Sequence, residues 1–229
     1  MAVERSCFLP QFPDSNALWK GPCPRLAFDT DAREKLSRVA QGMEPVWDVL
    51  AYVVLPLWVV CGFLDYLCHR ASHMENATGA RESLLHWLML LEVMLPLFLA
   101  VFFRINALVL ALMLLCLAAH EITGYYDLKL AMATRKVTAF EHQVHSALEI
   151  LPLTAMLLIM TLHWPQTLAL FGLGSQHADF SLGPKQMPRW GELVPPSAAF
   201  IGLAILPYME ELWRGLRARQ ETQNEKAGR

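Results

Sequence analysis

Histidines and carboxylates recur in this sequence at the spacing of one helical turn. Asp65, His69 and His73 lie four residues apart, and Glu82 and His86 repeat that spacing. Four residues of an α-helix turn through about 400°, so the first three side chains would lie within about 80° of one another on the helix surface. Imidazole and carboxylate groups aligned in this way are suitable ligands for iron, zinc or manganese.

Two later segments of the chain extend this pattern. In the second of these segments, four residues would fall within about 100° of one another on one helix, namely Glu141, His142, His145 and Glu149. The later members are His120, Glu121, Asp127, Glu141, His142, His145 and Glu149. Six histidines and several carboxylates are more than one tetrahedral zinc ion requires, so we predict a site for two metal ions. The predicted ligands are His69, His73, His86, His120, His142, His145, Asp65, Glu82, Glu121, Asp127 and Glu141. The predicted catalytic residues are Glu82, Glu121 and Glu141.

A simpler interpretation exists for each of these residues taken alone. A histidine at a membrane interface is commonly an ordinary amphipathic side chain, and Glu141 could simply pair with Arg135 or Lys136. The metal hypothesis depends on the number of such residues and on their alignment. Two ferrous ions would bring four positive charges that neutral imidazoles cannot offset in a low-dielectric bundle, so we expect some of the carboxylates to bind the metals directly.

Apolar segments separate these polar groups. Only 17% of the residues are charged, whereas a soluble domain usually has about a quarter. A membrane-spanning helix needs about 20 mostly apolar residues. Five segments meet or approach this requirement: 47–66, 84–103, 105–119, 144–162 and 194–213. The last is the weakest because Glu210 and Glu211 lie at its end. The fold class that we predict is therefore an all-α, polytopic transmembrane bundle of about five helices.

The alternation of these spans brings the predicted ligands to one side of the membrane. The first span ends just before His69, the second begins near His86, and the third ends at His120. The fourth span then begins at the segment that contains His142 and His145. Short loops on this side carry an excess of Lys and Arg, which predicts that the metal site faces the cytoplasm.

The segments outside the spans suggest three regions. Residues 1–46 are proline-rich and then charged, which indicates a surface arm or an interfacial helix. Residues 47–213 would form the metal-binding bundle, and residues 214–229 a mobile polar tail. The formal net charge of −2 shows no basic excess, which argues against nucleic acid as a partner.

The stretch from Asp65 to His73, with the sequence DYLCHRASH, resembles the first histidine box of the fatty acid hydroxylase and sterol desaturase superfamily. The resemblance implies that His69 and His73 bind iron, with His86 in the second box and His142 and His145 in the third. It also implies a di-iron enzyme that uses dioxygen to hydroxylate or desaturate lipid-like substrates. The later boxes of that family contain adjacent histidine pairs, whereas this chain has carboxylates at the corresponding places.

The hypothesis that we favour is a membrane-embedded di-iron oxygenase or oxidase with a hydrophobic, lipid-like substrate. Its partners would be membrane lipids, dioxygen and an electron donor, and its cofactor two iron ions. One alternative is a zinc-dependent membrane hydrolase of a lipid, in which a carboxylate acts as general base. Another is a membrane protein that binds a metal or haem without catalysis; histidines on different helices would suffice for haem.

Overall fold

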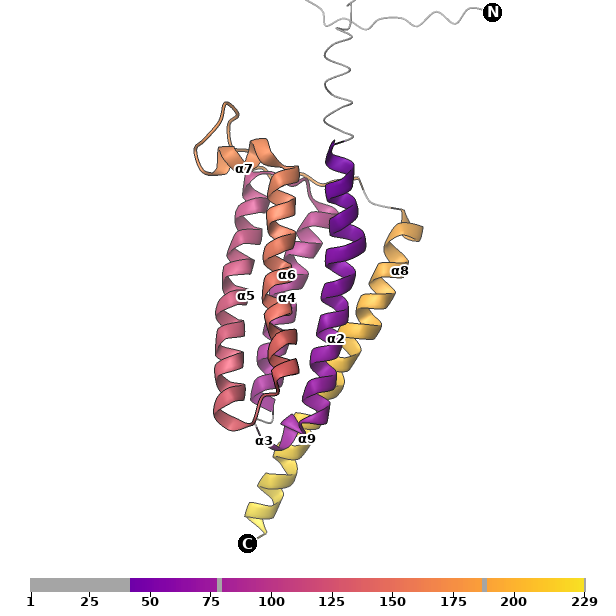
Figure 1. The fold of residues 1–229 in the computed structure, drawn as a ribbon, viewed down its shortest axis with the longest axis vertical. Helices are drawn as coiled ribbons and strands as arrows, with labels where there is room; N and C mark the ends of the chain where they lie inside the picture. Colours follow the sequence, from indigo (N-terminus) through magenta and orange to yellow (C-terminus); the bar gives the residue numbers. More distant parts are fainter. Residues whose placement is uncertain (1–41, 78–79, 187–188, 229) are drawn as a thin grey trace, which may run out of the picture. The chain divides into compact units, whose positions relative to one another are not determined.

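Five helices of the structure are long and apolar enough to cross a membrane. The structure is a computed structural model that describes residues 42–77, 80–186 and 189–228, without the side chains of residues 76 and 192. The five helices are Gly42–Ala71, Ala80–Phe102, Ala107–Thr134, Ala139–Leu162 and Leu193–Ala227. This result confirms the predicted all-α bundle with five candidate spans (Figure 1).

Shorter elements complete the chain between and within these spans. The first span contains a π-helical turn, η1, and continues as α2; the fifth consists of α8, the π-helical turn η2 and α9. The helices that follow α2 are α3, α4, α5, α6 and α7. The bounds are η1 Leu50–Val54, α2 Leu55–Ala71, α3 Met74–Ala77, α4 Ala80–Phe102, α5 Ala107–Thr134, α6 Ala139–Leu162, α7 Trp164–Leu170, α8 Trp190–Phe200, η2 Ile201–Ile205 and α9 Leu206–Ala227.

Each π-helical turn ends two residues before a proline. Pro56 is the second residue of α2 and follows η1, and Pro207 occupies the same position in α9 after η2. Proline has no N–H to donate to the preceding turn, and a locally wider turn is one way in which a long helix accommodates this loss. The two spans therefore continue through their prolines without ending.

Two side chains fix the points at which central helices begin. The Asn106 side chain accepts a hydrogen bond from the Val109 N–H at 3.1 Å and caps α5. At the start of α6, the Thr138 hydroxyl accepts from the Glu141 N–H at 3.1 Å, while the Glu141 carboxylate accepts from the Thr138 N–H at 3.4 Å. This reciprocal capping box holds Glu141 in the first turn of α6.

The apolar core lies in the half of the bundle formed by the start of α2, the end of α4, the start of α5 and the end of α6. Its buried members include Val54, Leu99, Leu110 and Ile159. Large apolar side chains such as Leu91 and Leu115 are exposed on the outer surface. An outer surface of this kind suits helices that contact lipid, because lipid tails are themselves apolar.

Helices that alternate in direction bring several of their ends together at the other half of the bundle. The end of α2, the start of α4, the end of α5 and the start of α6 meet there, and α9 passes beside α2 and α4 (Figure 1). Which side of the membrane this end faces stays a prediction.

The structure differs from the predicted spans in two places. The third span does not end at residue 119, because α5 continues as a helix to Thr134. The fifth span continues through Glu210 and Glu211, and the polar segment after Trp213 is helical to Ala227. The predicted surface arm lies, for residues 1–41, outside the described residues.

Candidate metal centre

Eight ionisable side chains from five helices are buried together at the end of the bundle where the helix ends meet. None of them is more than 7% exposed. We call this group the acid–histidine cluster, and it consists of Asp65 and His69 from α2, Glu82 and His86 from α4, Asp127 from α5, Glu141 and His145 from α6, and Glu211 from α9. Groups of this kind are costly to bury unless they are paired or bind a cation.

The same short pattern supplies six of the eight side chains. Each of α2, α4 and α6 carries a carboxylate followed by a histidine four residues later. Residues at this spacing lie one above the other on a helix, so each helix presents its acid and its imidazole to the same neighbours. Bundle proteins that bind two metal ions through carboxylates use a comparable arrangement, with acid and histidine on adjacent turns of facing helices.

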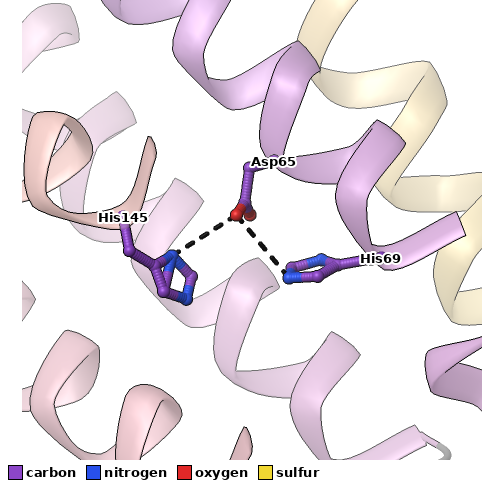
Figure 2. Close-up of side chains that lie close together, drawn as sticks. All are labelled: Asp65, His69 and His145. Carbon is purple, nitrogen blue, oxygen red and sulfur yellow. Dashed lines mark ion pairs between the residues drawn. The ribbon is translucent and has the colours of Figure 1, made fainter. Parts of the chain in front are cut away.

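Asp65 lies between two histidines from different helices (Figure 2). Its Oδ1 atom is 3.6 Å from Nε2 of His69 and 3.3 Å from Nδ1 of His145. The three side chains form one of the groups whose donor atoms are close enough to share a metal ion.

The Nε2 atom of His69 faces further carboxylates. It is 3.8 Å from Oε1 of Glu82 and 3.6 Å from Oε1 of Glu141, and it has no hydrogen-bond partner among the described residues. Two ligand atoms that are each about 2.1 Å from a tetrahedral metal lie about 3.4 Å apart. The observed separations are slightly longer than this, so a small shift would bring these atoms to ligating distance.

Asp127 joins the other two histidines in a similar way. Its carboxylate oxygens lie 3.3 Å from Nε2 of His86 and 3.2 Å from Nε2 of His145. Glu82, His86 and Asp127 form a second group that could hold a metal ion. The two groups share no residue, which is compatible with two adjacent metal positions.

Glu211 contacts two histidines from the opposite side of their rings. One of its oxygens is 3.1 Å from Nδ1 of His69 and the other is 2.8 Å from Nδ1 of His86. The two rings are stacked with their centroids 4.6 Å apart. A carboxylate accepts the Nδ1 proton of each ring, so the lone pair of each neutral ring is on Nε2 and faces the other carboxylates. Carboxylates in this position orient histidine ligands in many metal sites.

Arg135, between α5 and α6, pairs with two carboxylates of the cluster. Its Nη2 atom is 2.7 Å from Oε1 of Glu82 and 2.5 Å from Oε1 of Glu141. Burial alone would lower the pKa of this guanidinium, but the hydrogen bonds and charges of the two carboxylates outweigh burial and raise the pKa above its usual value. The arginine therefore stays charged and offsets one of the buried negative charges.

The charge of the cluster supports a cation site. Its five carboxylates and the single guanidinium of Arg135 leave four negative charges if the histidines are neutral. Protons on all three histidines would offset three of these charges, whereas two divalent metal ions would offset all four. Several buried atoms also lack a hydrogen-bond partner within the described part of the chain: Asp65 Oδ1, His69 Nε2, Glu82 Oε2, Asp127 Oδ1 and His145 Nε2.

A second network of charges covers the cluster on the side of α9. The Arg70 guanidinium donates to the Tyr66 hydroxyl at 2.9 Å and to Glu210 at 3.0 Å, and the Tyr66 hydroxyl also donates to Glu210. Arg214 pairs with Glu75 at 2.6 Å and with Glu210 at 3.0 Å. These contacts fasten α9 to α2 and α3 next to the buried histidines.

The structure brings together seven of the residues predicted from the sequence. These are Asp65, His69, Glu82, His86, Asp127, Glu141 and His145. It does not bring the other four to the cluster, namely His73, His120, Glu121 and His142.

His73 requires a correction because α2 ends at Ala71, before the predicted stripe is complete. The backbone of His73 has a φ angle of 51°, its side chain is 74% exposed, and its nearest charged partner is Glu75 at 3.5 Å. Glu121 and His142 are also exposed. Each directly follows a buried residue, and one residue turns a helix by about 100°, away from the cluster.

His120 is buried but belongs to a different polar group. Its Nδ1 atom is 3.8 Å from Glu92, and Thr123 donates a hydrogen bond to the same carboxylate at 2.9 Å. His120 precedes Asp127 by seven residues, or about 10 Å along a helix. The extension of α5 to Thr134 therefore places His120 two turns away from the cluster.

The predicted ligands included neither Glu211, which is a member of the cluster, nor Arg135, which pairs with two of its carboxylates. A pair of glutamates at the end of an apolar span was a signal for Glu211, because a carboxylate in a span is costly unless it has a partner. Arg135 was expected only as one possible ion-pair partner of Glu141, and the structure forms this pair.

Comparisons with protein-family models, with curated proteins and with solved structures give no match to this chain. The resemblance to fatty acid hydroxylases therefore stays a prediction.

Proposed function

We propose that the acid–histidine cluster binds two divalent metal ions and that the protein is a membrane-embedded di-iron oxidoreductase. The observation that carries this proposal is the convergence of three acid–histidine pairs from α2, α4 and α6, some of whose atoms have no hydrogen-bond partner among the described residues. The excess of four buried negative charges adds to it, because two divalent ions would neutralise this excess completely.

The chain offers distinct residues to each ion. Asp65, His69 and His145 would hold one, and Glu82, His86 and Asp127 the other. Glu141 lies beside His69 but pairs with Arg135, so it would join the first ion only by giving up that ion pair. Glu211 would keep the Nε2 atoms of His69 and His86 directed at the metals.

The mixture of ligand types favours iron. Carboxylate and imidazole together suit iron or manganese, and cysteine does not belong to the cluster. Bound iron would supply the redox chemistry needed to activate dioxygen. The protein's own residues would orient the ions, and the buried position of the cluster would keep bulk water away from the reacting groups.

A hydrophobic substrate is the class that best fits this location. The cluster lies at the end of helices whose outer surfaces expose large apolar side chains, including Leu84, Leu88 and Ile122. A substrate dissolved in the bilayer could approach between the helices without first entering water. Hydroxylation or desaturation of a lipid-like molecule is therefore the reaction that we propose.

Metal analysis of the protein purified in detergent tests the first part of this proposal. The chain offers two matched pairs of variants: His69→Ala with His73→Ala as control, and His145→Ala with His142→Ala as control. We expect two irons per wild-type chain, loss of at least one from each cluster variant, and no loss from the controls. Equal metal content in all five proteins would refute the assignment of the site.

The reaction is tested separately with iron-loaded protein, a chemical reductant and isotopically labelled dioxygen. Extracted membrane lipids would serve as the substrate mixture, and mass spectrometry would detect either gain of labelled oxygen or loss of two hydrogens. The His69→Ala variant is the negative control. Zinc in place of iron, with hydrolysed lipids as products, would support the hydrolase alternative instead.

A further inference from the structure

A small cavity adjoins the acid–histidine cluster between α4, α5 and α6. Its volume is about 10 Å³, and Met89, Gly124, Asp127, His145, Leu148 and Glu149 line it. One buried water molecule requires at least about 10–15 Å³. The cavity is therefore at the lower limit for one small ligand and too small for a lipid chain.

The walls of the cavity combine the metal site with an additional acid. Asp127 and His145 are members of the cluster, and their facing atoms are 3.2 Å apart. Glu149 follows His145 by one helical turn on the same face of α6. A small polar molecule needs two to four polar partners when it is buried, and these three side chains provide them.

Gly124 sets the size of the cavity. A Cβ atom built at this position would lie 3.5 Å from Cε of Met89 and 3.7 Å from Oε1 of Glu149. Both of those residues line the cavity, so a methyl group at position 124 would point into it. These separations are ordinary van der Waals distances, so α5 can accept an alanine here without a shift of its backbone.

We propose that this cavity is the binding position for a small exogenous ligand, such as water, hydroxide or an anion of similar width, beside the metal ions. Asp127 and His145 belong to the metal site on one side of this position, and Glu149 offers it a hydrogen-bonding group on another. The inference rests on the proposed function, because it requires a metal in the cluster. It identifies the position of the small ligand and the residues that limit the size of that ligand.

Azide binding to cobalt(II)-loaded protein provides the test, since azide changes the visible spectrum of cobalt when it binds to the metal. Gly124→Ala makes the cavity smaller and should weaken azide binding by about tenfold or more, with unchanged cobalt content. Leu148→Ala makes the cavity larger and should leave azide binding as tight as in the wild type or tighter. Gly202→Ala is the matched control, because a Cβ atom there meets nothing within 4 Å.

The outcomes separate the two proposals. If the wild type binds no cobalt, the metal site itself is refuted, and this inference with it. If all four proteins bind cobalt and azide equally, the metal site stands but the cavity is not the ligand position. If Gly124→Ala does not fold, the comparison of Leu148→Ala with the wild type decides, and weaker azide binding in that variant would overturn the inference.

Discussion

Replacing Glu211 by Gln keeps the length of the side chain but removes its charge and one of its two acceptor oxygens. In the structure each oxygen serves one histidine, at 3.1 Å from Nδ1 of His69 and at 2.8 Å from Nδ1 of His86. An amide can accept a proton from one ring, but its NH₂ group would face the N–H of the other. At least one histidine must then move its proton to Nε2, the atom that faces the carboxylates.

The size of the effect follows from this change of tautomer. A histidine protonated on Nε2 cannot bind a metal through that atom. Loss of a carboxylate that orients a ligating histidine typically costs about 10- to 100-fold in metal affinity. We expect Glu211→Gln to lower the affinity for at least one ion by about this factor, with a smaller effect on the other ion.

Competition with a chelator of known affinity, followed by metal analysis, measures this loss. Glu210→Gln is the control because Glu210 is adjacent in the chain but pairs with Arg70, Tyr66 and Arg214 instead of the histidines. The reasoning would be refuted if Glu211→Gln held both metals as tightly as the wild type. It would also be refuted if Glu210→Gln weakened binding to the same extent.

Four further predictions concern the surroundings of the cluster. Arg135→Ala should destabilise the metal-free protein by about 3–5 kcal/mol, because Glu82 and Glu141 lose their buried cation; unfolding monitored with and without metal would show a smaller loss in the loaded form. His120→Ala should leave the metal content unchanged, and a loss of one ion would return this histidine to the ligand set. Thr138→Ala removes the cap of α6 and should cost about 1 kcal/mol in a thermal unfolding assay. Removal of metal by a chelator should lower the melting temperature, and metal retention should fall as the pH is lowered, because protons compete for imidazole and carboxylate ligands.

The sequence was sufficient to predict the spans and the acid–histidine pairs. Long apolar segments have few alternatives to helices in a membrane, and the spacing of four residues is preserved in any helix. The side of the bundle on which His69, His86 and His145 meet then follows from the alternation of the spans.

The errors arose where the polar sequence did not mark the end of a helix. The apolar run of the third span ends at residue 119, but α5 continues to Thr134, with His120, Thr123, Gly124, Asp127 and Ala131 buried along it. His120 is therefore two turns from Asp127 and not beside it. At His73 the opposite occurred, since α2 ends at Ala71 although the spacing would have allowed another turn.

Glu211 could not be assigned from the sequence because its role depends on tertiary packing. Its partners belong to α2 and α4, more than a hundred residues earlier in the chain. Whether Glu210 or Glu211 faces them depends on the rotation of α9 about its axis, and a single residue changes that rotation by about 100°. Two hydrogen bonds of Tyr208 hold α9 in this rotation: the Tyr208 hydroxyl donates to the Gly62 carbonyl, and the Trp87 indole N–H donates to the Tyr208 carbonyl.

The position of Glu211 also links metal binding to the docking of α9. Most of the fifth span is exposed to the surroundings of the bundle, and the main apolar core is formed by the other four spans. The apolar contacts of α9 near the cluster are few, with Tyr208 and Leu90 among the buried residues. Its buried carboxylate, Glu211, forms hydrogen bonds with His69 and His86. Metal ions that fix these two rings would strengthen both hydrogen bonds, so the loaded cluster should hold α9 more firmly than the metal-free one.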